Sequence, residues 1–135
     1  MGLKVLCTYE QSTGHLVCND DKTGKTKIDD KNCYAGSQSG GGRDDPAKQG
    51  DKNNGPLPRG DWDIGGHDNS KGPLTIDLSP RSGNDVFNTN RDPNSFRVHG
   101  DSRAHPGDAS QGCIICGRNT RQTLVNEGGA ITVIK

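Results

Sequence analysis

The segment FRVHGDSRAHPGDASQGCIICGRNTR, residues 96–121, holds the strongest evidence for the fold of this chain. Two apolar runs, FRVH and CIIC, lie on either side of a loop that is rich in Gly, Asp and Ser. β-branched and aromatic residues bounded by turn residues are typical of short strands. The segment therefore predicts two strands joined by a polar loop, and it carries two of the four histidines and two of the five cysteines.

The rest of the chain repeats this pattern of short apolar runs and polar loops. Only 27% of the 135 residues are hydrophobic, and 20 are glycine. The runs LKVLCTY, HLVC, WDI, LTIDL and AITVI each have strand length. One short helix is expected at residues 119–126, with Asn119 as its cap and a Gly-Gly stop. The pattern predicts a loop-rich, mainly β domain with a small core.

The length predicts a single domain, residues 1–135, with three regions. Residues 1–33 form an N-terminal hairpin region, residues 34–56 a Gly-rich loop, and residues 57–135 the remaining core. A polar loop of this length inside a small domain is either functional or disordered. We therefore expect a lid over a binding site or a disordered segment.

The charge balance and the N-terminus limit the possible partners and the cellular route. Lys plus Arg and Asp plus Glu are both 17, so the basic face that nucleic acid requires is not expected. No apolar run is long enough to predict membrane insertion. The start MGLKVLCTYEQ lacks a small-residue cleavage site, so we expect synthesis in the cytoplasm without a Sec signal.

The five cysteines predict at least one disulfide. The stretch CTYEQSTGHLVC reads as a hairpin whose turn centres on residues 12–13, which places Cys7 directly opposite Cys18. Facing cysteines on paired strands are near disulfide distance, and a disulfide there would indicate an oxidising destination. Two buried thiols are the alternative, and Cys33 could pair with Cys116.

Three kinds of chemistry are possible in residues 97–117. His99, His105, Cys113 and Cys116 could form a zinc site, although the two histidines fall on a loop interrupted by Gly and Pro. The CIIC motif could cycle a disulfide, although no βαβ pattern surrounds it. The third possibility is nucleophilic catalysis by a cysteine.

Nucleophilic catalysis needs a base, amide donors for the oxyanion and a tight turn that presents the sulfur. The ASQGC turn brings Gly112 and Cys113 together, and their amides could point at one spot. His99 ends the FRVH run and is the candidate base. Asp101 or a nearby carbonyl could fix its tautomer, although Asp101 could equally be a turn residue.

The same segment resembles the active-site segment of L,D-transpeptidase-like domains, in which a strand His-Gly precedes a Ser-x-Gly-Cys-Ile/Val turn. It is most similar to the small Tlde1-like branch of type VI secretion effectors. GPLPRGDWDIGG, TYEQSTGHLV and TRQTLVNEGGAITVIK are similar to other parts of that branch. The resemblance implies a small β-sandwich or open barrel, a catalytic core within residues 57–135, and no cofactor or metal.

The resemblance implies an L,D-transpeptidase or L,D-carboxypeptidase that acts on peptidoglycan tetrapeptide stems. Cys113 would attack the carbonyl before the terminal D-Ala, and His99 would take the thiol proton and return it to the departing amine. The amides of Gly112 and Cys113 would hold the oxyanion. The thioacyl group would then pass to water, to a D-amino acid or to another stem.

Further residues receive roles, and two positions depart from the family pattern. Ser110 would brace the turn, Arg118 would pair with a stem carboxylate, and Arg97 is a second candidate for that contact. Gln111 stands where many relatives have His, and Cys116 stands where an aliphatic residue is expected.

The resemblance also implies a biological setting. The chain would be an antibacterial toxin that the type VI secretion apparatus delivers into the periplasm of target bacteria. A cognate immunity protein would block its cleft. The alternative is a binding module without turnover, held together by zinc or disulfides.

Overall fold

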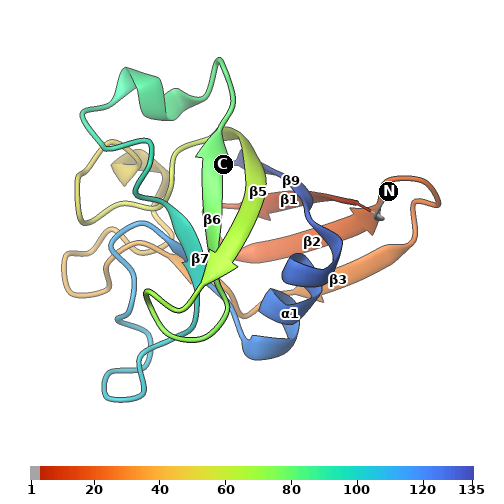
Figure 1. Ribbon diagram of the computed structural model, residues 1–135. Coiled ribbons are helices and arrows are strands. Elements are labelled where there is room, and N and C mark those ends of the chain that lie inside the picture. Colours follow the sequence, from red (N-terminus) through yellow and green to blue (C-terminus); the bar gives the residue numbers. More distant parts are fainter. Residues whose placement is uncertain (1–3) are drawn as a thin grey trace.

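A single curled sheet of nine strands forms the body of the protein (Figure 1). The structure is a computed structural model that describes residues 4–135. The sheet order is β3-β2-β1-β9-β5-β6-β7-β8-β4, and the strands are β1 Val5–Glu10, β2 His15–Asp20, β3 Thr26–Asp30, β4 Tyr34–Ala35, β5 Gly60–Asp68, β6 Thr75–Pro80, β7 Arg97–His99, β8 Ile114–Ile115 and β9 Gly129–Ile134. The mainly β half-barrel agrees with the expected fold class. Within residues 4–135, no helix is both long and apolar enough to cross a membrane.

The N-terminal hairpin has the predicted register. β1 and β2 pair antiparallel with Cys7 opposite Cys18, and the two form a disulfide. Gly14 completes the turn at φ +76°, and a Cβ at this position would collide with the carbonyl oxygen of Cys33. Glycine is therefore required here for both its conformation and its lack of a side chain.

The last strand joins the two halves of the sheet. β9 pairs parallel with β1 and antiparallel with β5. Its buried residues face the same core as alternate residues of β1, and Trp62 of β5 is fully buried beside them. The Trp62 ring meets Phe96 edge-on at 5.1 Å between centroids. This core packs against Phe96, which directly precedes β7.

The one α-helix within residues 4–135, α1, runs over Arg118–Glu127 and contacts β3, β5 and β6. It matches the expected helix at 119–126 within one residue at each end. Its N-cap is Gly117 rather than the expected Asn119, and no side chain caps the first turn. Two short 3-10 helices, η1 Pro46–Lys48 and η2 Asp85–Asn88, lie in the loops.

The Gly-rich loop, residues 34–56, packs closely against itself. Its backbone bonds to itself, for example from the Ser37 amide to the Asn54 carbonyl at 2.6 Å. A Cβ on Gly36, Gly42 or Gly55 would collide with backbone carbonyl groups of the same loop. The glycines therefore allow segments of the loop to pack closely together, and Lys52 and Asn53 form one wall of the pocket described below.

Candidate active site

Cys113 lies on a tight turn immediately before β8. Its side chain is almost buried, and it is the free cysteine of the chain. The thiol Sγ lies 3.8 Å from the carbonyl oxygen of Ser95. The preceding Gly112 has φ +148°, and a Cβ there would lie 2.9 Å from the Phe96 ring and collide with the Arg91 guanidinium. Only glycine fits this turn, as the ASQGC motif indicated.

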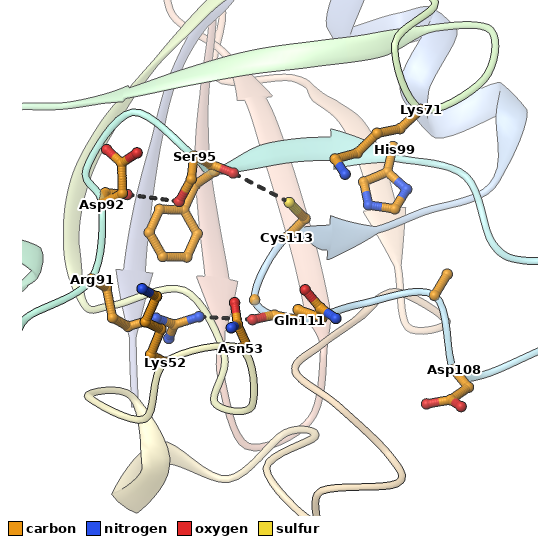
Figure 2. Close-up of a pocket in the computed structure, with 13 residues that line it drawn as sticks. Lys52, Asn53, Lys71, Arg91, Asp92, Ser95, His99, Asp108, Gln111 and Cys113 are labelled. Carbon is orange, nitrogen blue, oxygen red and sulfur yellow. Dashed lines mark hydrogen bonds between the residues drawn. The ribbon is translucent and has the colours of Figure 1, made fainter.

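His99 ends β7, the strand next to the Cys113 turn. β7 and β8 pair parallel, with His99 opposite Ile115. Cys113 is two residues before Ile115, so the two side chains point to the same face of the sheet. Figure 2 shows both lining one pocket. The structure thus brings together the predicted nucleophile and base.

A backbone carbonyl fixes the tautomer of His99. Nδ1 lies 2.9 Å from the carbonyl oxygen of Gly100, which can only accept, so Nδ1 carries the proton. Nε2 then keeps its lone pair and can accept a proton. Of the two predicted ways to fix the tautomer, the structure uses the carbonyl rather than Asp101.

Burial keeps both groups neutral at rest. Desolvation raises the pKa of the Cys113 thiol above its ordinary value, although the Arg97 amide and nearby cations oppose this. Desolvation also lowers the pKa of His99, and Lys71 and Arg121 lower it further. A neutral imidazole beside a neutral thiol is suited to act as a general base when the sulfur attacks.

Ser110 holds the nucleophile turn, as expected. Its hydroxyl donates to the carbonyl of Cys113 at 2.6 Å and accepts from the amides of Gly36 and Gly112 at 2.9 and 3.0 Å. The Gly112 N–H, a predicted oxyanion donor, thus donates to the Ser110 hydroxyl in this structure. Among residues 4–135, no hydrogen-bond acceptor meets the Cys113 amide, which can still stabilise an oxyanion.

Asp101 organises the loop after β7. Its carboxylate accepts from the Tyr34 hydroxyl at 2.7 Å and from the amides of Ser102 and Gly107. The Tyr34 hydroxyl in turn accepts from the Ala109 amide at 2.9 Å. Asp101 therefore acts as the turn residue that was the alternative to a catalytic role, and it stabilises the loop that leads to Cys113.

Arg91 is a buried clamp that sequence reasoning missed. Its guanidinium donates to the carbonyls of Gln49, Pro56 and Gln111 at 2.7–2.9 Å and lies over the Phe96 ring. Burial lowers its pKa to about 10. It ties the Gly-rich loop to the nucleophile turn. No local signal marks it, because it lies in a polar loop between Asn90 and Asp92.

The pocket has a volume of about 570 Å³, and the cations that line it are not the two arginines that the sequence suggested for binding a stem carboxylate. Arg118 is exposed on the first turn of α1, and Arg97 forms an ion pair with Asp77 at 2.9 Å; neither lines the pocket. The structure therefore does not bring these two arginines to the pocket, and their contact with the substrate stays a prediction. The cations that line it are Lys52, Lys71 and Arg91.

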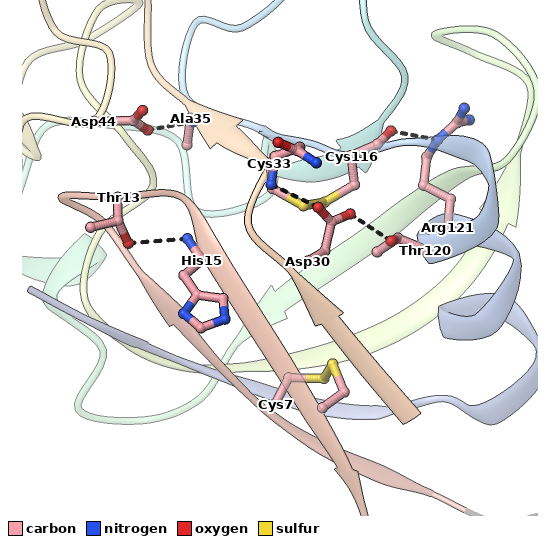
Figure 3. Close-up of a disulfide and its surroundings, with 12 residues drawn as sticks. Cys7, Thr13, His15, Asp30, Cys33, Ala35, Asp44, Cys116, Thr120 and Arg121 are labelled. Carbon is pink, nitrogen blue, oxygen red and sulfur yellow. Dashed lines mark hydrogen bonds between the residues drawn. A yellow bond between two sulfur atoms is a disulfide. The ribbon is translucent and has the colours of Figure 1, made fainter. Parts of the chain in front are cut away.

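The remaining cysteines form a second disulfide that excludes two of the alternatives. Cys116 pairs with Cys33, so CIIC does not form its own disulfide (Figure 3). The Cys116 amide also donates to the carbonyl of His99 at 3.1 Å. His105 is exposed in the loop, and in the described part of the chain no metal-binding group joins it to His99, Cys113 and Cys116. The four-ligand zinc site is therefore wrong.

Comparisons with known proteins provide a fold but no close relative. No family model and no curated protein matches the sequence. The helical cell shape determining protein Pgp2 from Campylobacter jejuni is similar in structure, with a TM-score of 0.63 and 14% identity over 99% of this chain and 48% of that one. L,D-transpeptidase 1 from Mycobacterium tuberculosis has a TM-score of 0.54 at 14% identity, over 99% of this chain and 63% of that one. The chain spans about half the length of Pgp2. The chain has an L,D-transpeptidase-like fold.

Proposed function

We propose that this protein is a peptidoglycan-modifying cysteine enzyme, an L,D-transpeptidase or L,D-carboxypeptidase that acts on tetrapeptide stems. The observation that carries the proposal is the free thiol of Cys113 in one pocket with a neutral His99 whose Nε2 is available. The fold supports the same reaction class. The chemistry needs no group beyond this chain and its substrates.

The reaction proceeds through a thioester. Sγ of Cys113 attacks the carbonyl carbon before the terminal D-Ala, and its proton passes to Nε2 of His99. The Cys113 amide stabilises the oxyanion that forms. The C–N bond then breaks, and His99 returns the proton to the amine that leaves. Water, a D-amino acid or the amine of another stem attacks the thioester and releases the thiol.

We further propose that the protein works as an antibacterial toxin in the periplasm of target bacteria. The type VI secretion apparatus would deliver it, and a cognate immunity protein would cover the Cys113 pocket. The two disulfides support a destination outside a reducing cytoplasm, since disulfides persist in oxidising compartments. Expression directed to the periplasm of a bacterium, compared with cytoplasmic expression, tests this route: lysis is expected in the first case only.

The enzymatic proposal is tested with purified muropeptides. Oxidised protein is incubated with tetrapeptide muropeptides, and mass spectrometry resolves tripeptide, D-amino-acid-exchanged and crosslinked products. We expect one of these products from the wild type and none from Cys113→Ala or His99→Ala. Lys27→Ala, at a surface ion pair with Glu127, is the control and should retain activity.

Two results would overturn the assignment. Product formed at the wild-type rate by both Cys113→Ala and His99→Ala would exclude the mechanism. No product from the folded wild type, with both disulfides intact, would favour the alternative of a disulfide-stabilised binding module.

A further inference from the structure

Lys71 lies in the pocket on the side of His99. It belongs to the loop between β5 and β6, and Figure 2 shows its side chain directed toward the histidine. Its charge affects the pKa of both His99 and Cys113. Within residues 4–135 it has no ion-pair partner, so its ammonium group can bind an anionic ligand.

Hydrogen bonds order the backbone of the loop that carries Lys71. The Lys71 amide donates to Oγ1 of the buried Thr75, which donates to the carbonyl of Gly72 at 2.7 Å. Arg121 of α1 donates to the carbonyls of Pro73 and Cys116 at 2.5 and 3.0 Å. Arg121 thereby ties this loop to the end of the strand that follows Cys113. These hydrogen bonds fix the backbone of the loop at Lys71, whose side chain is exposed.

The other two cations of the pocket differ from Lys71 in their hydrogen bonds or in their effect on His99 and Cys113. Arg91 already donates to three backbone carbonyls. Lys52 lies on the Gly-rich loop, and its charge is not among the causes that shift the pKa of His99 or Cys113. Among the described residues that line this pocket, Lys71 is therefore the cation whose side chain has no hydrogen-bond or ion-pair partner and whose charge acts on His99.

We propose that Lys71 determines substrate specificity by binding the C-terminal carboxylate of the residue that leaves. The inference rests on the proposed function, in which His99 protonates the leaving amine. In a terminal amino acid one carbon separates that amine from the carboxylate. A cation beside the base is therefore placed to meet the carboxylate, through charge-assisted hydrogen bonds. The enzyme then selects chain ends with a free carboxylate over internal peptide bonds.

A pair of affinity labels tests this without requiring turnover. Iodoacetyl-D-alanine and its C-terminal amide alkylate the free thiol: the sulfur displaces iodide, and an S–C bond forms as the C–I bond breaks. After reaction the carboxylate lies one atom further from the sulfur than in the tetrahedral intermediate. Alkylation of Cys113 is followed by intact-protein mass spectrometry. The measured quantity is the ratio of the acid rate to the amide rate.

The ratio of the acid rate to the amide rate measures recognition of the carboxylate separately from the reactivity of the thiol. Loss of the Lys71 charge alters the thiolate fraction of Cys113, but it does so equally for both labels. We expect the ratio to fall about tenfold in Lys71→Met, equivalent to about 1.4 kcal/mol. Lys52→Met, which removes a charge from the Gly-rich side of the same pocket, should leave the ratio within about twofold, because the charge of Lys52 does not act on His99 or Cys113.

An unchanged ratio in Lys71→Met overturns the inference. An equal fall in Lys71→Met and Lys52→Met also overturns it, because that result would indicate a general positive potential. The proposed function fails separately, when folded wild type forms no muropeptide product. Where turnover is found, Lys71→Met should abolish the preference for tetrapeptide over its C-terminal amide.

Discussion

The two disulfides should contribute unequally to stability, and the chain allows a direct comparison. Each pair is replaced by alanines, Cys33→Ala with Cys116→Ala in one variant and Cys7→Ala with Cys18→Ala in the other. All four side chains are buried, with at most 3% of their surface exposed, so the cost of shortening them is similar. The difference between the variants should therefore come from the unfolded chain.

The magnitude follows from the lengths of the closed loops. The sequence separation is 83 residues for Cys33–Cys116 and 11 for Cys7–Cys18. The loop-closure relation converts these to about 4.5 and about 2.8 kcal/mol. We expect the free energy of unfolding to fall by about 1.7 kcal/mol more in the first variant.

Urea denaturation of the oxidised wild type and both variants, followed by circular dichroism, measures this difference. Equal slopes with urea would indicate that the same surface is exposed in each transition. An equal loss in both variants, or a larger loss from Cys7–Cys18, would refute the closure-entropy reasoning. Reduction of the wild type should lower its stability at least as much as the larger single loss.

Three further predictions concern the site. Gly112→Ala should lower the free energy of unfolding by about 1–3 kcal/mol, because φ +148° strains any residue other than glycine. The same variant should slow alkylation of Cys113, and a wild-type stability together with a wild-type alkylation rate would contradict the prediction. Arg91→Met should lower the free energy of unfolding by about 3 kcal/mol or more, since three carbonyls lose their donor at about 1–3 kcal/mol each. Urea denaturation measures this loss, and a loss below about 1 kcal/mol would exclude a stabilising role for the Arg91 hydrogen bonds. Burial lowers the pKa of His99, and only the neutral imidazole accepts the thiol proton, so muropeptide turnover should fall with decreasing pH through a midpoint below about 6.5; a pH–rate profile with a higher midpoint would contradict the assigned base.

Local features of the fold could be predicted from the sequence. The β1–β2 hairpin depends on a turn and two short runs within sixteen residues, Val5 to Asp20, so its register followed from the position of the turn. The helix α1 was likewise marked by its composition and by the Gly-Gly stop. The order of the sheet was not predictable in this way, since β9 lies between β1 and β5.

The placement of His99 and Cys113 in one pocket was predictable, because these residues lie on or next to neighbouring strands. His99 and Cys113 were identified because a strand end and a tight turn have local signatures. Lys71 and Arg91 lie in other loops and reach the pocket only through the pairing of β6 with β7 and through long-range hydrogen bonds. Arg118 is close to Cys113 in sequence, but the helix directs it to solvent.

The bridge between Cys33 and Cys116 also bears on how the protein matures. Five cysteines can form several non-native disulfides during oxidation. Cys116 lies only three residues from Cys113, so a Cys113–Cys116 disulfide is the non-native pairing that forms most readily. Once the Cys33–Cys116 and Cys7–Cys18 disulfides have formed, no other cysteine thiol remains within residues 4–135 to form a disulfide with Cys113. Correct oxidative folding therefore leaves Cys113 as the free thiol, because the other four cysteines are paired with one another.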